Sequence, residues 1–446
     1  MEVCVKIQLP EKVKFIIDTI TAAGFEAFAV GGCIRDSILG REPNDWDITT
    51  SAKPEQVKAL FRRTIDTGIA HGTVTIMLEK EGFEVTTYRI DGEYEDSRHP
   101  KEVTFTSNLI EDLKRRDFTI NAFAYNETTG LVDAFEGLKD IENGVIRCVG
   151  DAKERFTEDA LRILRAIRFS AQLGYEIEES TREGIRLLAG NLRHISAERI
   201  QVELTKLLTS PHPDYIRVAY ETGVTAVILP ELDECMRTEQ KHPHHCYSVG
   251  EHTLQSLDKV PPVKELRLAM LLHDIAKPQT LTRDEDGTTH FHGHPKVSAK
   301  MAEEILKRLR YDNDTIYKVT RLVEFHDYGK GVKPDLRLAR RAVNRIGEDI
   351  FPMLMPVYRA DVLAQSEYKR EEKLEAIAMW EQLFAEIQAK KQCVSLKTLA
   401  VNGSDLIALG MKPGKEIGET LHALLDHVLD HPEDNNKETL IRKVQL

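Results

Sequence analysis

The sequence predicts an α/β N-terminal domain followed by an entirely helical remainder. Helical and strand patterns alternate over roughly the first 145 residues, which is typical of an α/β domain. From about residue 150 onward, strand signals nearly vanish and helical periodicity continues to the C-terminus. With 446 residues, the chain is long enough for several domains. We predict four parts, over residues 1–147, 148–230, 231–365 and 366–446.

The elements of the first domain follow from apolar spacing and from glycine positions. Apolar residues between positions 13 and 20 recur at helical spacing, and Gly24 can end that helix. The pair Gly31-Gly32 predicts a turn between a strand and a short helix. We therefore predict helices over residues 11–23, 33–40 and 54–61. We predict strands over residues 25–30, 45–50, 72–78 and 83–90, the last two forming a hairpin.

Composition and charge limit the class of protein. The chain is 41% hydrophobic and 30% charged, which is ordinary for a soluble globular protein. It has no apolar run of about 18 residues and no signal-peptide pattern, so we expect no membrane span. Its six cysteines are scattered without a C-x-x-C pair, which indicates reduced thiols and a cytoplasmic protein. The net charge of −12 argues against a general polycation but allows a local basic stripe that binds RNA.

Asp45 and Asp47 lie two positions apart in a run of strand-favouring residues. Residues i and i+2 of a strand point to the same face, so the carboxylates would repel unless a cation lay between them. A divalent cation is one interpretation, and an exposed strand end with two solvated acids is the other. The glycine pair and Arg35 could hold a triphosphate beside such a metal, at the N-terminus of the short helix. This combination suits two-metal phosphoryl or nucleotidyl transfer.

A basic stripe is predicted on a helix that begins with Thr157 as its N-cap and ends at Gly174. Its charged residues recur every three positions, so they drift slowly around one face while leucine and isoleucine occupy a neighbouring face. The alternative interpretation is a solvated basic surface. The charged residues are Asp159, Arg162, Arg165 and Arg168.

The middle of the chain is rich in histidine. A His-Asp pair such as His273-Asp274, within an apolar helix, is a poor choice for a core unless a partner or an ion satisfies it. The segment from Cys235 to Cys246 also contains three histidines, but its spacing matches no standard zinc pattern. A zinc site and a loop that leads into a helix both remain open for this segment.

Three stretches identify a family by resemblance. "AVGGCIRDSILGREPNDWDIT", "RRDFTINAFAYN" and "EDALRILRAIRF" resemble the class II tRNA nucleotidyltransferases, the CCA-adding enzymes, and the related bacterial poly(A) polymerases. "VNGSDLIALGMKPGKEIG" is similar to the family's C-terminal segment, so the resemblance covers nearly the whole chain. It implies a polymerase-β-like nucleotidyltransferase head, followed by an all-α neck, body and tail that bind RNA.

The resemblance also implies residue roles. Asp45 and Asp47 would hold the catalytic Mg²⁺, and Glu84 is either a third carboxylate near the metals or a solvated strand residue. Residues 91–105 resemble the family's flexible loop, which favours addition of the terminal adenosine. The residues implied to bind the nucleotide are Gly32, Arg35, Arg116, Asp117, Asn121, Asp159, Arg162, Arg165 and Arg168.

The histidine-rich segments resemble the HD phosphohydrolase superfamily, which implies a second, transition-metal site. Related two-module enzymes resemble phosphatases or 2′,3′-cyclic phosphodiesterases in this domain. The alternative is an inherited scaffold that only supports tRNA. The implied ligands are His252, His273, Asp274, His294, His326 and Asp361.

We therefore expect template-independent addition of C, C and A to the 3′ end of tRNA, from CTP and ATP with Mg²⁺. A poly(A) polymerase and an adenosine-only enzyme are the nearest alternatives. An HD phosphohydrolase whose first domain senses nucleotides, or a non-catalytic tRNA-binding protein, would belong to other classes. The intact pair Asp45 and Asp47 disfavours both of these. The sequence leaves the oligomeric state open.

Overall fold

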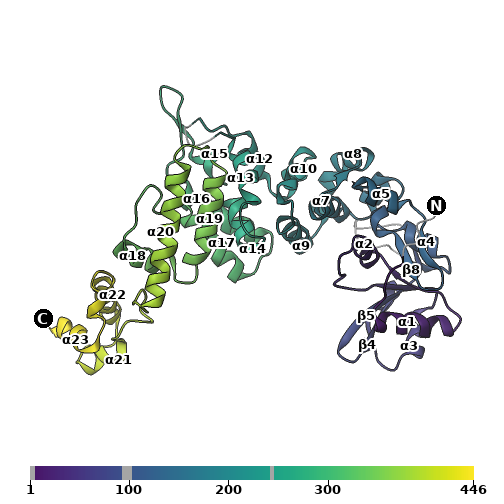
Figure 1. Cartoon of the computed structure of the whole chain (residues 1–446), viewed down its shortest axis with the longest axis horizontal. Coiled ribbons are helices and arrows are strands. Elements are labelled where there is room, and N and C mark those ends of the chain that lie inside the picture. The colour runs from purple at the N-terminus through teal and green to yellow at the C-terminus, as the bar shows by residue number, and fades with distance from the viewer. Residues whose placement is uncertain (1–5, 93–102, 242–245, 446) are drawn as a thin grey trace. The chain divides into compact units, whose positions relative to one another are not determined.

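A computed structural model describes residues 6–92, 103–241 and 246–445 of the chain. The chain divides into two compact units, residues 1–230 and residues 231–446, and each is described by itself (Figure 1). The finer division into four parts stays a prediction.

The first unit contains a seven-stranded sheet in the order β3-β4-β5-β2-β1-β8-β9. Neighbouring strands are antiparallel except β2 and β5, which run parallel with Ile48 opposite Val85. This mixed sheet confirms the predicted α/β head. The strands are β1 (Ala27–Val30), β2 (Ile48–Thr50), β3 (Thr64–Gly68), β4 (Thr73–Leu78), β5 (Glu81–Thr87), β8 (Phe123–Asn126) and β9 (Gly130–Asp133).

Two helices lie side by side against this sheet, α1 (Glu11–Ala22) and α3 (Pro54–Leu60) (Figure 1). The apolar stripe of α1 is fully buried and joins apolar residues of β1, β2, β4 and β5 in one core. Burial of this stripe is the main stabilisation of α1, because an isolated helix of this length is marginal in water.

Short elements complete the first unit. Two small strand pairs lie outside the main sheet, β6 (Arg89–Asp91) with β7 (Val103–Phe105) and β10 (Val145–Ile146) with β11 (Glu176–Ile177). The helices are α2 (Gly32–Ile38), α4 (Leu109–Lys114), α5 (Gly137–Asn143), α6 (Ala152–Glu158), α7 (Leu161–Leu173), α8 (Glu179–Leu188), α9 (Ala197–Leu208), α10 (Ile216–Glu221) and α11 (Thr225–Ile228).

The second unit is helical, as predicted, apart from a two-stranded hairpin of β12 (Thr282–Arg283) and β13 (Thr289–His290). No helix in the described part of the chain is long and apolar enough to cross a membrane. The helices are α12 (Pro230–Arg237), α13 (Val249–Leu257), α14 (Lys264–Leu272), α15 (Lys277–Thr280), α16 (His294–Arg308), α17 (Asn313–Phe325), α18 (Leu336–Ile346), α19 (Phe351–Leu363), α20 (Arg370–Ala389), α21 (Gly403–Ala408), α22 (Lys415–Asp430) and α23 (Lys437–Gln445).

Two predicted elements are wrong in detail at functional positions. Strand β2 begins at Ile48, so Asp45 and Asp47 precede the strand instead of lying in it. The helix predicted from Thr157 is broken, because Asp159 is extended (φ −140°) and separates α6 from α7. The Asp159 side chain accepts a hydrogen bond of 3.0 Å from the N–H of Leu161, and this local capping competes with continuation of the helix. Gly174 ends α7 in the left-handed conformation, as predicted.

Candidate active site

The glycine pair ends β1 and opens α2. Gly31 has φ 86°, a conformation that side-chain-bearing residues rarely adopt, and a Cβ atom there would lie 3.0 Å from Nη1 of Arg116. The N–H of Gly31 donates a hydrogen bond of 3.1 Å to the carbonyl of Phe123. Glycine at this position therefore lets the Arg116 guanidinium lie against the turn that leads to Gly32.

Asp45 and Asp47 lie in the exposed segment before β2. Within the described ranges, no protein group donates a hydrogen bond to either carboxylate. Desolvation raises the pKa of Asp47; the charge of Arg116 opposes this shift and the charge of Asp45 adds to it. Two carboxylates that repel each other and have no protein donors are suitable oxygen ligands for Mg²⁺. These residues therefore fit the metal that the sequence predicts.

Glu84 is exposed in β5, where its backbone pairs with Thr75 of β4. The parallel register between β2 and β5 pairs Ile48 with Val85, so Asp47 and Glu84 each precede this pair by one residue. A role for Glu84 as a third carboxylate stays a prediction.

A chain of polar contacts joins predicted residues from three separate stretches. Nη1 of Arg35 in α2 donates to Oδ1 of Asn121 at 2.6 Å. Nδ2 of Asn121 donates to Oδ1 of Asp117 at 3.1 Å, and Nε of Arg165 in α7 donates to the other carboxylate oxygen at 2.7 Å. The structure thus brings together Arg35, Asn121, Asp117 and Arg165, and it connects the glycine turn with α7.

Asp117 is the anionic centre of this chain of contacts. Burial alone would raise the pKa of Asp117, but the charge of Arg165 and the hydrogen bond from Asn121 lower that pKa to about 2. Asp117 therefore remains ionised near neutral pH and holds Arg165 in a fixed position.

Phe169 is a residue of this site that the sequence analysis missed. Its buried ring lies under three guanidinium groups, with ring-centroid distances of 5.0 Å to Arg35, 5.4 Å to Arg165 and 3.8 Å to Arg168. An apolar residue in a helix is normally assigned to the core, and only its position between arginines in "LRAIRF" could have indicated this contact.

Asp112, also missed, is a fully buried carboxylate in α4. It accepts hydrogen bonds from the Thr49 hydroxyl at 3.0 Å and from Nε of Arg115 at 2.9 Å. Nη2 of Arg116 lies 3.8 Å from Oδ2 of Asp112, the oxygen that accepts from Thr49. Asp112 therefore ties β2 to the arginines beside the glycine turn. The charged segment "EDLKRRD" gives no sign that this one acid is buried.

The charged residues predicted for one helix face are separated by the structure. Asp159 precedes α7 and pairs with Arg199 at 2.8 Å, and Arg162 pairs with Glu158 at 2.7 Å. Arg168 is only 6% exposed and pairs with the buried Glu203, so the alternative interpretation, a solvated basic surface, does not hold at this residue. The drift of a three-residue spacing around a helix explains this result, because it carries Arg168 toward the core.

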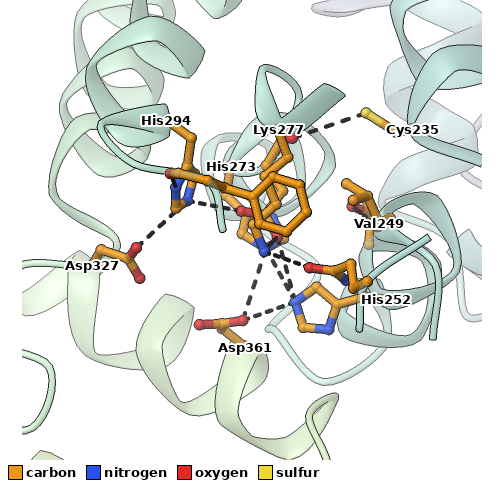
Figure 2. A network of polar contacts seen from close by, with 12 residues as sticks. Cys235, Val249, His252, His273, Lys277, His294, Asp327 and Asp361 are labelled. Atoms are coloured by element: carbon orange, nitrogen blue, oxygen red, sulfur yellow. Dashed lines mark hydrogen bonds and ion pairs between the residues drawn. The ribbon is translucent and has the colours of Figure 1, made fainter. Parts of the chain in front are cut away.

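The second unit brings all six predicted HD-type residues together in one buried cluster. Figure 2 shows four of them, His252, His273, His294 and Asp361. His252 belongs to α13, His273 and Asp274 directly follow α14, His294 begins α16, His326 follows α17 and Asp361 belongs to α19. Side chains that are distant in sequence thus converge from five helices.

The four imidazoles are oriented alike. Each Nδ1 lies 2.7–3.3 Å from a backbone carbonyl oxygen, which can only accept, so Nδ1 carries the proton. Each Nε2 therefore faces the carboxylates and, when deprotonated, offers its lone pair to a metal. Nε2 of His252 lies 2.8 Å from Asp361, and the two oxygens of Asp274 lie 3.2 Å from His273 and 3.1 Å from His294.

This donor set fits a metal. His252, His273 and Asp274 form one group of possible ligands, and Asp274, His294 and His326 form a second. Within each group, the donor atoms lie within 4.8 Å of one another. Orientation of imidazole ligands by a hydrogen bond from the other ring nitrogen is usual around protein metals. Imidazole nitrogens combined with carboxylate oxygens suit a divalent transition metal.

Three further polar residues lie beside the cluster and were missed as site residues. Nζ of Lys277 lies 2.7 Å from Asp274, and Nζ of Lys330 lies 2.5 Å from Asp361 and also contacts Asp327. Asp327 in turn lies 3.5 Å from Nε2 of His294. The repeated His-Asp dipeptide at 326–327 was the signal for Asp327. The cluster opens into a cavity of about 880 Å³ that these residues line together with Trp380.

Two further sequence predictions depend on residues outside the described ranges. Cys235 is buried in α12 with Sγ 3.6 Å from the carbonyl oxygen of Ile275, and Cys246 is exposed. The three histidines between them lie at positions 242, 244 and 245, so the zinc site is untested. Most of the predicted flexible loop, residues 93–102, also lies outside the described ranges.

Comparison with known proteins gives consistent matches along the chain. Family models match for the poly A polymerase head domain over residues 27–147 and a probable RNA and SrmB-binding site of polymerase A over residues 174–236. A third model, tRNA nucleotidyltransferase domain 2, matches residues 279–444. The CCA-adding enzyme of Levilactobacillus brevis is 37% identical over 98% of both chains, and that of Streptococcus thermophilus is 33% identical over 96% of this chain and 95% of its own.

Solved structures agree with these matches. The Bacillus stearothermophilus CCA-adding enzyme in complex with CTP superimposes with a TM-score of 0.72, at 28% identity over 98% of both chains. The Thermotoga maritima CCA-adding enzyme has the same fold, with a TM-score of 0.61 at 21% identity over 98% of this chain and 96% of that one. This chain therefore belongs to the CCA-adding enzymes, the class II tRNA nucleotidyltransferases.

Proposed function

We propose that this protein is a cytoplasmic enzyme that adds C, C and A to the 3′ end of immature or damaged tRNA, from CTP and ATP and without a nucleic-acid template. The observation that carries the proposal is the chain of contacts from Arg35 through Asn121 and Asp117 to Arg165. It connects the glycine turn, which would bind the phosphates beside Asp45 and Asp47, with the helix that would read the base.

The residues around the glycine turn would hold the nucleotide for attack by the tRNA 3′-hydroxyl on the α-phosphorus, with pyrophosphate leaving. A Mg²⁺ ion held by Asp45 and Asp47 would supply charge stabilisation for the reacting phosphate. Arg116 lies against the turn at Gly31, where its charge would face the triphosphate near Gly32. Arg35 and Asn121, which contact each other, would bind the phosphates and the sugar.

Base selection without a template follows from the order of donors and acceptors. Cytosine and adenine each present an amino donor beside a ring-nitrogen acceptor, whereas guanine and uracil present a carbonyl acceptor beside an N–H donor. A carboxylate only accepts and a guanidinium only donates. Asp159 facing the amino group and Arg162 facing the ring nitrogen would therefore match C and A. Oδ1 of Asp159 accepts from Leu161 and Oδ2 accepts from Arg199, but each carboxylate oxygen has a further lone pair. Arg162 has five N–H groups, so both residues can bind a base while Asp159 keeps Arg199 and Arg162 keeps Glu158.

A tRNA transcript that lacks its 3′ CCA distinguishes the activities. Incubation with CTP alone should add two residues, ATP alone should add none, and both nucleotides together should add three. Growth of a long A tail would move the assignment to poly(A) polymerase. Extension only of a transcript that already ends in CC would make the protein an adenosine-only enzyme.

We propose a second activity in the second unit, metal-dependent hydrolysis of phosphate esters. The carrying observation is the common orientation of the four imidazoles toward Asp274 and Asp361. A transition-metal ion held by these residues would activate water for attack on phosphorus. Lys277 and Lys330 would provide positive charge for the phosphate.

Purified protein should bind Mn²⁺, Ni²⁺ or Co²⁺ and should hydrolyse 2′,3′-cyclic AMP. Asp274→Ala removes the carboxylate shared by both donor groups and should abolish metal binding and hydrolysis, while nucleotide addition continues. Wild-type protein that binds none of these metals and shows no hydrolysis would instead support the scaffold interpretation.

A further inference from the structure

Lys330 contacts a predicted metal ligand from the cavity side. Its ammonium lies 2.5 Å from Oδ2 of Asp361, while Oδ1 of the same carboxylate lies 2.8 Å from Nε2 of His252. Lys330 also pairs with Asp327. The lysine and the imidazole thus approach opposite oxygens of one carboxylate, so a divalent ion bound by Asp361 would compete with Lys330 for its charge.

Lys277, the other lysine beside the cluster, is differently placed. It is buried, its ammonium donates 2.9 Å to Oε1 of Gln240, and it lies 5.2 Å from the ring centroid of Phe291. Lys277 also pairs with the predicted ligand Asp274 at 2.7 Å, but Gln240 and Phe291 would continue to hold its ammonium if Asp274 bound a metal.

Among the residues that the structure describes, the Lys330 ammonium contacts only the carboxylates of Asp327 and Asp361, and its side chain is 35% exposed. It lies between Gly329 and Gly331, both with left-handed φ angles, in the turn after α17. Glycine on both sides leaves the backbone freer to change conformation than other residues would. Lys330 also lines the cavity of about 880 Å³ into which the cluster opens.

The net charge of the site supports a change in the partner of Lys330 when a metal binds. Three carboxylates, Asp274, Asp327 and Asp361, face two lysines, which leaves a net charge of about −1 if the imidazoles are neutral. Binding of one or two divalent ions would make the site positive, and the lysine ammonium would then be repelled from the ligands. A phosphate in the cavity, which Lys330 lines, would be an anion able to accept it.

We propose that Lys330 is a displaceable counter-ion, which releases Asp361 to a divalent metal and then binds the phosphate group of the substrate. The inference rests on the proposed phosphohydrolase activity. Lys330 would therefore weaken metal binding and strengthen phosphate binding.

The test compares the wild type with Lys330→Met, Lys330→Arg and a control, Lys318→Met. Lys318 pairs with Asp314 at 2.6 Å on α17 and does not line the cavity, so it matches the loss of one lysine–aspartate pair. Ni²⁺ and Mn²⁺ affinity is measured by calorimetry, and metal content by elemental analysis. Inorganic phosphate binding to the metal-loaded protein and hydrolysis of 2′,3′-cyclic AMP are measured in parallel.

Lys330→Met should bind Ni²⁺ about tenfold more tightly, because a competing cation is lost. The same variant should bind inorganic phosphate about tenfold more weakly and raise KM for the cyclic nucleotide. Lys330→Arg should stay near the wild type in metal affinity, and Lys318→Met should match the wild type in every measurement.

Unchanged or weaker metal affinity in Lys330→Met, with the wild type binding metal normally, would overturn the inference and leave the phosphohydrolase proposal intact. Tighter metal binding with unchanged phosphate binding would overturn the second half of the exchange. Absence of metal binding in the wild type would overturn the phosphohydrolase proposal, and this inference with it.

Discussion

The Arg35 guanidinium donates a hydrogen bond of 2.6 Å to the side-chain oxygen of Asn121, which lies 86 positions further along the chain. The Asn121 amide nitrogen then donates to Asp117. One buried amide therefore satisfies an arginine of the glycine-turn helix and an aspartate that holds α7. Because an amide has both a donor and an acceptor group, it can make both contacts, which an ionised carboxylate at this position could not.

Asn121→Ala should lower kcat/KM for CTP by about 10- to 100-fold, because buried partners are left unsatisfied at a cost of about 1–3 kcal/mol. Single-turnover addition to a tRNA transcript measures this effect. Asn108→Ala is the control, since Asn108 caps α4 by accepting a hydrogen bond from Ile110. It should lose about 1 kcal/mol of stability with little change in KM. Equal losses of activity in both variants would contradict the role of Asn121.

Asp45→Ala or Asp47→Ala should reduce the rate of nucleotide addition by about three or more orders of magnitude, because a metal at the reacting phosphate supplies several kcal/mol of charge stabilisation. Folding should survive, since removal of one carboxylate relieves repulsion. Steady-state addition at several Mg²⁺ concentrations is the measurement. Asp66→Ala, at an exposed aspartate of β3 paired with Lys58, should keep full activity. Near-normal turnover in either active-site variant would contradict the proposal that Asp45 and Asp47 hold the catalytic Mg²⁺.

Asp159→Ala or Arg162→Ala should reduce discrimination as well as rate, with UTP and GTP incorporation rising relative to CTP. A site that hydrogen-bonds a substrate can reject mismatched groups by about 10⁴-fold, because polar groups are left unpaired. Substitution of Arg165 or Arg168 should affect nucleotide binding more than the selection of the base. Asp117 pairs with Arg165 and Glu203 pairs with Arg168, so neither guanidinium is free to read the base edge. Competition between CTP and UTP on one transcript tests this, with Arg186→Ala on α8 as the control. An Asp159→Ala enzyme that is slower but fully selective would refute the base-reading role.

The pKa of Asp117, about 2 in the folded protein and 3.8 ordinarily, predicts a pH-dependent stability contribution. A carboxyl with a lowered folded pKa stabilises the fold above about pH 4, and this contribution is lost as pH falls toward 2. Asp117→Asn should therefore lower the free energy of unfolding by about 1–2 kcal/mol at pH 6, allowing for solvent screening at Arg165. Urea unfolding of both proteins between pH 6 and pH 3 measures the difference. A difference that stays constant over this range would contradict the shifted pKa.

The sequence correctly predicted those elements that are determined by residues close together in the chain. The stripe of α1, the glycine turn, the β4–β5 hairpin and the end of α7 at Gly174 all have such signals. The break at Asp159 was missed, because helical periodicity continues through it and only the side-chain contact with Leu161 reveals the cap. Strands β3, β8 and β9 were also missed, because their pairing depends on neighbours distant in sequence.

In the candidate sites too, some residues were predicted from the sequence and others were found only in the structure. Family resemblance supplied residues such as Asn121 and Asp361, whereas Phe169 and Asp112 were found only from the structure. Both act through tertiary contacts, an aromatic ring beneath arginines and a buried acid that binds a strand and a helix. Residue type alone assigns the first to the core and the second to the surface.

The orientation of the four imidazoles also makes the second unit observable by spectroscopy. Since every Nδ1–H donates to a main-chain carbonyl, each neutral ring should exist as a single tautomer with its unprotonated nitrogen at Nε2. Nitrogen-15 resonances of these Nε2 atoms should shift when a diamagnetic ion such as Zn²⁺ binds and stay fixed when tRNA or nucleotides bind elsewhere. The intact chain thus carries four internal reporters, which allow cation occupancy to be followed while nucleotide addition is in progress.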